Sequence, residues 1–597
     1  MTDYVAPLDE MMFVLTELAD LQGVSQLPGC EDATADLVSA ILEEAGKFGA
    51  GVLAPLNAIG DRQGSVMTDD GVRTPDGFKD AYAQFVEAGW NGLPFDPKWD
   101  GQGLPWVVAT AVSEIWNAAN LSFALCPMLT QGAVELLQDE APEPLQRKFL
   151  PKLVCGEWTG TMNLTEPQAG TDLSQVKTRA VRDGDVYRIT GQKIFISYGD
   201  HDLADNIIHM VLARTPDAPE GVRGISLFVV PKVMVNDDGS LGAPNDVQCV
   251  SLEHKLGIHA SPTAVMSYGD TDGAVGYLFG EENQGLAYMF NMMNNARLGV
   301  GLEGVALSDR AFQQARAYAF DRIQSRPIDG SSKTPVAIVN HPDVKRMLLT
   351  MKAQTEAARA LTYYAASCLD KAKRHNDPSV RRYNQALIDL LIPVVKAWST
   401  DNAVDVASLG IQVHGGMGYV EETGAAQVFR DARITPIYEG ANGIQAADLV
   451  GRKVAREKGL TVNSLMSLIR GLDKDMSGVD KEAIQAIRSQ LSAGVDALEV
   501  ATAWLLKTYA DNPAAVTGGA VSYLKLLGIV VGGWLMARAA LAADEKLSLN
   551  DGDPTFLAAK IATARFFADH FLIQADMLAS VFMRGPDAIA AADLDGL

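Results

Sequence analysis

One carboxylate in an apolar stretch is well placed for acid–base chemistry. Residues 434–445 read ITPIYEGANGIQ, with Glu439 between Tyr438 and Gly440 and no other acid nearby. A glycine after the acid lets the backbone turn sharply. If the site is buried, apolar neighbours raise the pKa of the carboxylate and so make it a stronger base. The plainer interpretation is a solvated acid in a turn, and this stretch taken alone favours it.

Six motifs along the chain change that balance. They are NLTEPQAGTD (163–172), GQKIFIS (191–197), KLGIHASPT (255–263), AFDRIQSRP (319–327), QVHGGMGY (412–419) and RDARITPIYEG (430–440). No one motif would suffice, but in this order and spacing they resemble the acyl-CoA dehydrogenases, a family of flavoenzymes. The resemblance covers roughly residues 40 to 452.

The resemblance implies a non-covalent FAD and assigns roles to particular residues. The FAD contacts would be Met162, Leu164, Thr165, Gly170, Thr171, Phe195, Ile196, Ser197, Arg322, Gln412, Gly415, Gly416 and Asn442. The substrate contacts would be Thr171, Asn294, Arg297, Tyr438 and Gly440, and the catalytic base would be Glu439.

Some of these positions depart from the family pattern. Phe195 stands where the family usually has Trp, and Ser197 stands where it has Thr, so the ring and the hydroxyl towards flavin N5 are kept. Asn294 replaces a more common Asp in the region that contacts CoA. Ala441 and Asn442 replace hydroxyl residues, although Asn442 can still donate a hydrogen bond.

Arg322 and the glycine pair at 415–416 would hold the far end of the cofactor. A lone Arg is usually a surface cation, but its guanidinium fork fits a pyrophosphate. In the family this Arg reaches the FAD diphosphate. Adjacent glycines permit close backbone approach, and in the family this loop contacts the FAD of a neighbouring subunit. The resemblance therefore implies at least a dimer.

Two other signals are set aside. Residues 299–304 read GVGLEG, a formal GxGxxG, but the preceding pattern is helical rather than a strand. Close packing of helices on these glycines is the better interpretation, so we expect no nicotinamide site. His414 lacks a carboxylate–histidine spacing, and we expect no metal site.

The chemistry implied is the α,β-dehydrogenation of an acyl-CoA thioester to the 2-enoyl-CoA. Removing the proton next to the thioester carbonyl needs a base stronger than a free Glu, whose pKa is ~4.3. Many members of the family place that base at the acid of IYEG, where its backbone N–H and a flavin ribityl hydroxyl polarise the carbonyl. The isolated Glu439 is thus interpreted as the base of an FAD-dependent oxidoreductase acting on CH–CH bonds.

Composition limits the partners. The chain of 597 residues has a net charge of −24, which opposes binding to nucleic acids and to anionic membranes. The five scattered cysteines indicate reduced thiols, and the acidic N-terminus shows no signal-peptide pattern. The most apolar run, Leu526 to Ala537, is shorter than a membrane span and predicts a buried core helix. We expect a cytoplasmic protein with no membrane span.

The elements that position the motifs are mainly helices around a central β-region. Residues 8–21 and 33–50 have helical periodicity, whereas 186–197, 207–214 and 224–232 have the character of strands. Residues 472–483 predict a polar loop. We expect the acyl-CoA dehydrogenase fold, mainly α with a central β-barrel domain, plus an extra C-terminal helical domain. The expected domains are 1–158 (helical, with an extension arm), 159–278 (β-barrel), 279–455 (helical, FAD and substrate) and 456–597 (helical).

The expected substrate depends on features outside the six motifs. The N-terminal arm, the C-terminal block and the insertion SSKTPVAIVN (331–340) match a long subtype that includes enzymes for 3-(methylthio)propanoyl-CoA in dimethylsulfoniopropionate demethylation. That substrate is favoured, with a short- or medium-chain fatty acyl-CoA of β-oxidation as the alternative. An acyl-CoA oxidase and a non-catalytic DNA-binding relative are weaker alternatives. The electron acceptor implied by the resemblance is electron-transferring flavoprotein.

Overall fold

The computed structural model describes residues 4–593 and 596, with the exception of the side chain of Asn291. The chain divides into two compact units. The helical unit comprises Met1–Gly46, Pro105–Glu114 and Arg297–Leu597, and the sheet unit comprises Lys47–Leu104 and Ile115–Ala296. Helices α3 (Ala35–Phe48), α6 (Trp106–Ala119) and α9 (Gly285–Asp321) pass from one unit into the other.

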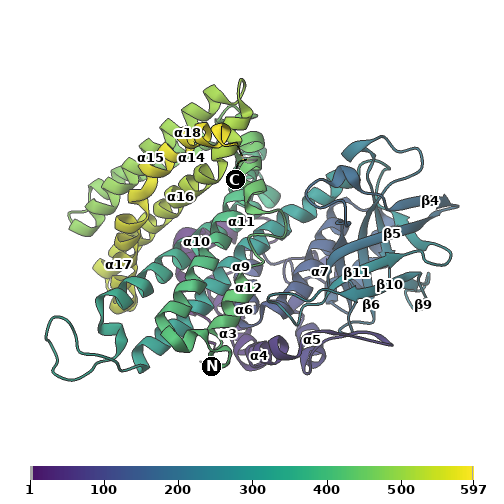
Figure 1. The fold of residues 1–597 in the computed structure, drawn as a ribbon, viewed down its shortest axis with the longest axis horizontal. Coiled ribbons are helices and arrows are strands. Elements are labelled where there is room, and N and C mark those ends of the chain that lie inside the picture. Colours follow the sequence, from purple (N-terminus) through teal and green to yellow (C-terminus); the bar gives the residue numbers. More distant parts are fainter. Residues whose placement is uncertain (1–3, 594–595, 597) are drawn as a thin grey trace. The chain divides into compact units, whose positions relative to one another are not determined.

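The sheet unit is built on an eight-stranded sheet in the order β10-β11-β5-β12-β7-β6-β3, with β4 also paired to β5 (Figure 1). The strands are β3 (Trp158–Asn163), β4 (Arg179–Asp183), β5 (Val186–Ser197), β6 (Asn206–Ala213), β7 (Ser226–Pro231), β10 (Val247–Leu252), β11 (Thr263–Tyr268) and β12 (Ala274–Leu278). Strands β3 and β6 are parallel and the other pairs are antiparallel. Because β3 and β10 end the path, the curled sheet is an open half-barrel.

The remaining elements of the sheet unit are helices and two hairpins. The helices are the π-helix Gly49–Leu53, α4 (Ala54–Gln63), α5 (Phe78–Glu87), α7 (Leu121–Glu140) and α8 (Glu143–Cys155). The hairpins are β1 (Val66–Thr68) with β2 (Gly71–Arg73), and β8 (Val233–Val235) with β9 (Leu241–Pro244). The strand predicted at 186–197 is confirmed as β5, and those at 207–214 and 224–232 are confirmed within two residues as β6 and β7.

The helical unit carries the long helices of the chain. Its N-terminal helices are α1 (Leu8–Phe13), the π-helix Val14–Leu18 and α2 (Leu21–Val24). The central helices are α9, α10 (Pro342–Arg374), α11 (Pro378–His414), α12 (Ala425–Ala432) and α13 (Asn442–Asp448), followed by the π-helix Leu449–Ala455. The helix predicted over 8–21 is interrupted at Asp20, whose φ of 56° is left-handed.

The glycines of GVGLEG pack α9 closely against α11. A Cβ on Gly301 would lie 2.5 Å from Val395 Cγ1, and one on Gly304 would lie 2.6 Å from the Ser399 carbonyl oxygen. Only glycine allows this approach of two backbones. The interpretation of this sequence as helix packing is therefore confirmed.

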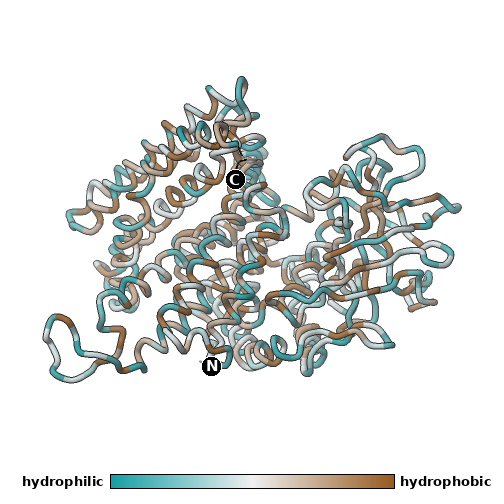
Figure 2. Tube along the Cα trace, in the orientation of Figure 1, coloured by the Kyte–Doolittle hydropathy of each residue, from teal (hydrophilic) through white to brown (hydrophobic). Residues whose placement is uncertain are grey.

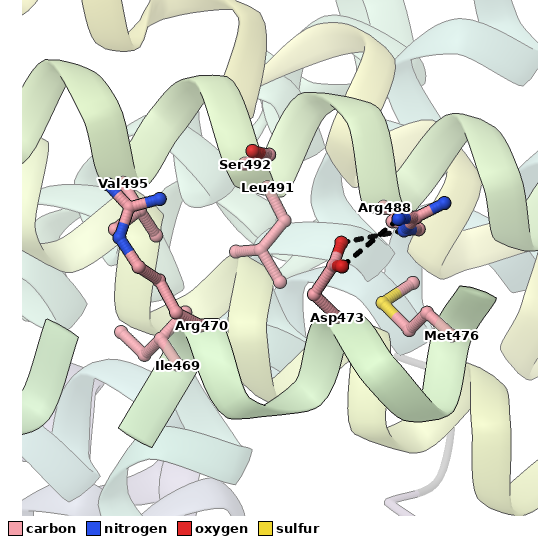
Figure 3. Close-up of a pocket in the computed structure, with 8 residues that line it drawn as sticks. All are labelled: Ile469, Arg470, Asp473, Met476, Arg488, Leu491, Ser492 and Val495. Atoms are coloured by element: carbon pink, nitrogen blue, oxygen red, sulfur yellow. Dashed lines mark hydrogen bonds and ion pairs between the residues drawn. The ribbon is translucent and has the colours of Figure 1, made fainter. Parts of the chain in front are cut away.

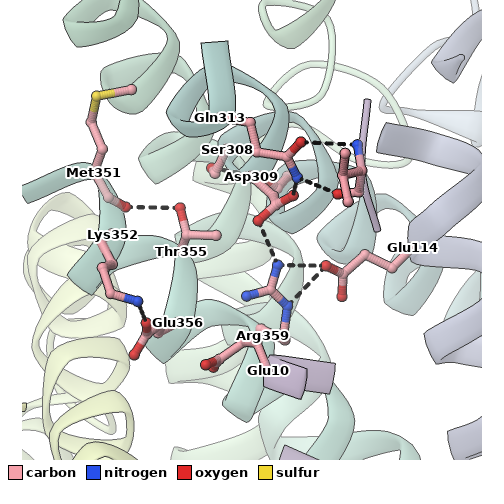
Figure 4. A network of polar contacts seen from close by, with 12 residues as sticks. Glu10, Glu114, Ser308, Asp309, Gln313, Met351, Lys352, Thr355, Glu356 and Arg359 are labelled. Carbon is pink, nitrogen blue, oxygen red and sulfur yellow. Dashed lines mark hydrogen bonds and ion pairs between the residues drawn. The ribbon is translucent and has the colours of Figure 1, made fainter. Parts of the chain in front are cut away.

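Buried ion pairs join the long helices to one another, to α6 and to α1 of the N-terminal arm. Arg359 of α10 contacts Glu114 at 2.7 Å and Asp309 at 3.0 Å, with all three side chains buried (Figure 4). Lys560 contacts Glu10 of α1 at 2.7 Å and Glu356 of α10 at 2.8 Å. Removing one partner from such a pair leaves a buried charge, so the Lys560–Glu10 contact helps to hold α1 against α17 (Pro554–His570).

The C-terminal block comprises α14 (Leu460–Ser477), α15 (Glu482–Thr508), α16 (Pro513–Leu549), α17 (Pro554–His570) and α18 (Ala575–Ala591). Figure 2 shows the hydrophobic runs along these helices. The buried helix predicted at 526–537 is confirmed as part of α16. By length and composition alone, α16 and the stretch Pro554–Ala591 could each cross a membrane, but 83% of the apolar window of α16 is buried within the protein, as in a core helix.

The loop predicted at 472–483 is confirmed only at residues 478–481 and is wrong elsewhere. Helix α14 continues to Ser477, and only residues 478–481 separate it from α15. Met476 is buried, and Asp473 pairs with Arg488 of α15 at 2.6 Å. These contacts keep a polar sequence helical against its neighbour.

Candidate functional site

Glu439 lies in a tight turn between α12 and α13. Its own φ is 54° and that of Gly440 is 88°, so two successive residues are left-handed. The φ of Gly440 explains why glycine follows the acid, and a Cβ there would also lie 2.5 Å from Gln445 Nε2. A glutamate at positive φ is uncommon, and such backbone strain concentrates at functional sites.

Three side chains hold the carbonyl groups of this turn. Arg297 Nε donates to the Glu439 carbonyl at 3.4 Å, and Gln445 Nε2 donates to the same oxygen at 3.2 Å. Lys396 Nζ donates to the Gly440 carbonyl at 2.9 Å. The strained turn is thus fixed through its backbone, and the acidic side chain is left out of the network.

The Glu439 carboxylate is poised to accept a proton. Burial raises its pKa, and the charges of Arg297 and Lys396 offset only part of that effect. The side chain is half-buried, so it can still meet a ligand. Within the described residues, neither this carboxylate nor the Glu439 N–H makes a hydrogen bond to the chain. A basic, unpaired carboxylate beside an unused N–H donor suits proton abstraction next to a polarised carbonyl.

The sequence interpretation missed two buried charged residues that lie next to this turn. Glu303 of α9 accepts a hydrogen bond from the Tyr438 hydroxyl, and Lys396 of α11 also donates to Asn442 Oδ1 at 2.8 Å. Both side chains are fully buried. The sequence feature that could have identified them is a single charged residue inside an apolar run: VGLEGV for Glu303 and LLIPVVKAW for Lys396.

The other predicted residues near this turn are engaged within the helical unit. The amide nitrogen of Asn442 donates to Ala397, Thr400 and Asp401, so its side chain fixes the start of α13. Arg297 is buried against Glu439. Their contacts with FAD and with CoA stay predictions.

In the sheet unit, the two predicted flavin motifs lie side by side. Ile194 N donates to the Thr165 carbonyl at 2.9 Å, which joins the 163–172 turn to β5. Phe195 has a φ of 58° and is 59% exposed, which is unusual for a bulky apolar side chain. The half-buried Thr165 and Ser197 carry hydroxyl groups. An exposed ring beside such donors fits a flat heteroaromatic cofactor such as a flavin.

A buried ion pair fixes this arrangement. Lys193 Nζ contacts Glu166 Oε1 at 2.8 Å and the Leu164 carbonyl at 3.1 Å, and both charged side chains are buried. Glu166 also accepts from Thr178 Oγ1 at 2.6 Å and from Lys177 N at 2.7 Å. Burial alone would raise the pKa of Glu166, but Lys193 and these hydrogen bonds lower it. The pair therefore ties the turn carrying Leu164 and Thr165 to the strand carrying Phe195.

The remaining predicted contacts of the sheet unit differ in exposure. Ile196 and Met162 are buried, so their contact with a cofactor would be made by the backbone or by the edge of a side chain. Gly170 and Thr171 are exposed, and Asn294 is half-buried in α9, one turn before Arg297.

Arg322 and the loop 412–416 lie near one another in the helical unit. Arg322, Gln412, Gly415 and Gly416 are exposed. The ring of Tyr318, one turn before Arg322, lies 4.5 Å from that of His414, which joins the end of α9 to the end of α11. The same region exposes apolar side chains of Phe320, Ile323, Met417 and Tyr419. An exposed guanidinium and an exposed glycine pair in this region suit a cofactor diphosphate.

A cavity of about 390 Å³ lies between α14 and α15 (Figure 3). Its floor is apolar, with Ile469, Met476, Leu491 and Val495. Each arginine at its rim is paired with acids: Arg488 with Asp473, and Arg470 with Asp496 and Glu499 at 2.7 Å. The cavity thus offers no uncompensated charge to a phosphorylated ligand. Among the described residues, no group of three or more His, Cys, Asp or Glu could hold a metal ion.

Four family models match the chain in succession. They are described as acyl-CoA dehydrogenase N-terminal domain (residues 38–157), middle domain (161–271), C-terminal domain (283–454) and acetyl-CoA dehydrogenase C-terminal like (467–593).

Relatives match over nearly the full length. The chain is 47% identical to a 3-methylmercaptopropionyl-CoA dehydrogenase from Ruegeria pomeroyi, over 99% of this chain and 100% of the relative. It is 36% identical to a butyryl-CoA dehydrogenase from Syntrophomonas wolfei, over 95% and 94% of the two chains. A crystal structure of an acyl-CoA dehydrogenase complexed with FAD from Bacillus anthracis superposes with a TM-score of 0.74 at 20% identity, covering 96% of this chain and 91% of that chain.

Proposed function

Since this chain belongs to the acyl-CoA dehydrogenase family, we propose that its substrate is a short acyl-CoA and that Glu439 is the catalytic base. The predicted family and fold are confirmed, including the extra C-terminal helical domain. The enzyme is an FAD-dependent oxidoreductase that converts an acyl-CoA to the 2-enoyl-CoA.

The observation that carries the assignment of the base is the state of Glu439. Its raised pKa, its half-exposed position and its unpaired carboxylate suit removal of the proton at C2 of the thioester. The unused Glu439 N–H is available to stabilise the negative charge that develops on the carbonyl oxygen. Arg297, Gln445 and Lys396 keep both groups in place through the backbone of the turn.

FAD, when bound, accepts the hydride that leaves C3. We assign the flavin ring to Phe195, Thr165 and Ser197 in the sheet unit, because an exposed ring and two hydroxyl groups fit its face and edge. In the helical unit we assign Arg322 and the Gly415–Gly416 pair to an FAD diphosphate, and the family resemblance gives the glycine pair to the FAD of a neighbouring subunit. The first test is that the purified protein is yellow and releases free flavin on denaturation; a colourless protein that FAD cannot reconstitute would contradict these assignments.

For the acyl group we favour 3-(methylthio)propanoyl-CoA. The 47% identical relative carries the name of that activity, whereas the butyryl-CoA relative is 36% identical. A thioether sulfur is close in size to a methylene and is polarisable, so a short apolar pocket suffices. Such a pocket discriminates against one methylene by only ~1–3 kcal/mol. We therefore expect overlapping activity on butanoyl-CoA and a steep fall for long chains.

The substrate is tested by steady-state kcat/KM on propanoyl-, butanoyl-, octanoyl-, palmitoyl- and methylthiopropanoyl-CoA. A maximum at the methylthio compound or at butanoyl-CoA is expected. A maximum at palmitoyl-CoA would exclude the short pocket, and turnover of butanoyl-CoA without the methylthio compound would remove the sulfur substrate. Oxygen consumption with substrate alone would point instead to an acyl-CoA oxidase.

The partners and location are also proposed. Electron-transferring flavoprotein is the proposed electron acceptor, as the family resemblance implies. A homodimer is supported by the exposed apolar groups around Arg322 and the glycine pair, and a cytoplasmic location by five cysteines that are all free. The division into domains 1–158, 159–278, 279–455 and 456–597 is supported by the succession of the four matched family models.

A further inference from the structure

A buried acid–base cluster lies directly behind the turn of Glu439. It comprises Glu303 on α9, Lys396 on α11 and Tyr438 on the turn itself. Glu303 and Lys396 have no exposed surface. A charge buried to this degree is costly unless it is paired or neutralised by a proton. The cluster therefore needs an explanation that packing alone does not give.

Glu303 uses only one of its two carboxyl oxygens. Oε2 accepts a hydrogen bond from the Tyr438 hydroxyl, whereas Oε1 is buried and has no partner within the described chain. An ionised carboxylate left with one bare oxygen in the interior would be strongly disfavoured. A protonated carboxyl group is the form that this environment tolerates.

The groups around Glu303 also favour its protonated form. Burial, with a contribution from the charge of Glu439, raises the pKa of Glu303 to about 8, because the Tyr438 hydrogen bond and the charge of Lys396 offset only part of the rise. Burial lowers the pKa of Lys396 to about 8, against the opposing effects of Glu439, Glu303 and Asp401, and with the help of Arg297. Near neutral pH the cluster thus holds a neutral Glu303 and a charged Lys396.

We propose that Glu303 is a positioning residue for the base: as a protonated carboxyl it anchors Tyr438, and it leaves the neighbouring Glu439 as the ionised carboxylate of the turn. This inference rests on the proposed function of Glu439. An ionised Glu303 would place a second negative charge against the turn and change the proton affinity of Glu439. The charged and titratable groups that face the cluster are Arg297 of α9, Lys396 and Asp401 of α11, Asp431 of α12, and Tyr438 and Glu439 of the turn.

The cluster also predicts a pH signature. Because Glu303 and Lys396 interact and titrate in the same range, the loss of one proton belongs to the pair rather than to either residue. That loss makes the surroundings of Glu439 more negative by one charge. The rate of flavin reduction by substrate should therefore show a step near pH 8, besides the step at lower pH that reports Glu439 itself.

The test compares the wild-type holoenzyme with Glu303→Gln in anaerobic rapid mixing with butanoyl-CoA across the pH range. Gln is nearly isosteric and fixes the neutral form, so one of the two groups that can lose the proton is removed. The step near pH 8 should move to higher pH. Infrared spectroscopy of the same proteins at neutral pH should show one protonated-carboxyl band fewer in Glu303→Gln.

Asp370→Asn is the matched control. Asp370 is also a buried carboxyl of the helical unit, with its pKa raised to about 6 by burial, but it accepts from Trp106 N and Val107 N at the start of α6. Its replacement should remove a carboxyl without moving the step. If Glu303→Gln does not fold, Tyr438→Phe serves instead, because loss of the donor that stabilises ionised Glu303 should also move the step to higher pH.

The outcomes separate this inference from the proposed function. An unmoved step, or an unchanged set of carboxyl bands, in folded Glu303→Gln overturns the role of Glu303. Complete loss of flavin reduction in a folded, yellow Glu303→Gln would overturn it too, because Glu303 would then be the base itself. Wild-type reduction by Glu439→Gln would instead overturn the assignment of Glu439, whatever Glu303 does.

Discussion

The turn of Glu166 in the sheet unit and the turn of Glu439 in the helical unit each carry a carboxylate beside a lysine, yet the two carboxylates are treated in opposite ways. Glu166 is paired with Lys193 and takes further hydrogen bonds from Thr178 and Lys177. Lys396 points at the backbone of its turn, and the Glu439 side chain receives no hydrogen bond from the described residues.

The difference distinguishes an acid that stabilises the fold from an acid that can take a proton from a substrate. Burial acts on both acids, but pairing lowers the pKa of Glu166, while the pKa of Glu439 stays raised. A carboxylate whose lone pairs are all used cannot take a proton from a substrate. In the Glu439 turn the protein instead uses its cations to fix the main chain, which leaves the side chain basic.

The largest effect is expected from Glu439→Gln. The amide cannot take a proton, so flavin reduction by butanoyl-CoA should slow by about 10²- to 10⁴-fold while FAD stays bound. Stopped-flow absorbance of the flavin measures this. Glu422→Gln is the control, since Glu422 is an exposed acid of the same segment and its loss should leave the rate unchanged.

The next effect is on stability and comes from Lys193→Met. It leaves Glu166 buried without its partner, which costs about 3–5 kcal/mol. The free energy of unfolding from denaturant titration should fall accordingly, FAD affinity should weaken, and the added change Glu166→Gln should restore part of the loss. Arg147→Ala breaks the exposed Arg147–Glu143 pair and should cost at most ~1 kcal/mol. Equal losses in the two single variants would erase the contrast between buried and exposed pairs.

A smaller, pH-dependent effect is expected from Glu303→Gln. The pKa of Glu303 rises from 4.5 to about 8 on folding, so between these values the folded state keeps a proton that the unfolded state has released. Stability from this group therefore falls as pH rises from about 4.5 to about 8, by on the order of a few kcal/mol. Glu303→Gln should flatten that slope in denaturant titrations at several pH values. A slope identical to that of the wild type would mean that Glu303 is already ionised at neutral pH.

The sequence predicts the fold class well, because helical periodicity and runs of strand-forming residues are local patterns. The run of β-branched and aromatic residues at 186–197 predicts β5, whereas Glu439 is identified only by the resemblance of six motifs taken together, and its role as the base stays a prediction. The partners of Glu439 could not be predicted, since Arg297, Lys396 and Gln445 meet it only after α9, α11 and α13 pack together. The polar stretch at 472–477 is wrongly predicted as a loop, because its helix depends on a contact with α15.

The origin of the C2 proton provides the most direct test of the central claim. Butanoyl-CoA would be incubated anaerobically in D₂O with the wild-type holoenzyme and with Glu439→Gln, without an electron acceptor, and recovered for mass spectrometry. Proton abstraction by Glu439 predicts that the wild type incorporates deuterium at C2 and that Glu439→Gln does not, although both bind FAD and substrate. Equal incorporation by the two proteins would show that another group removes the proton.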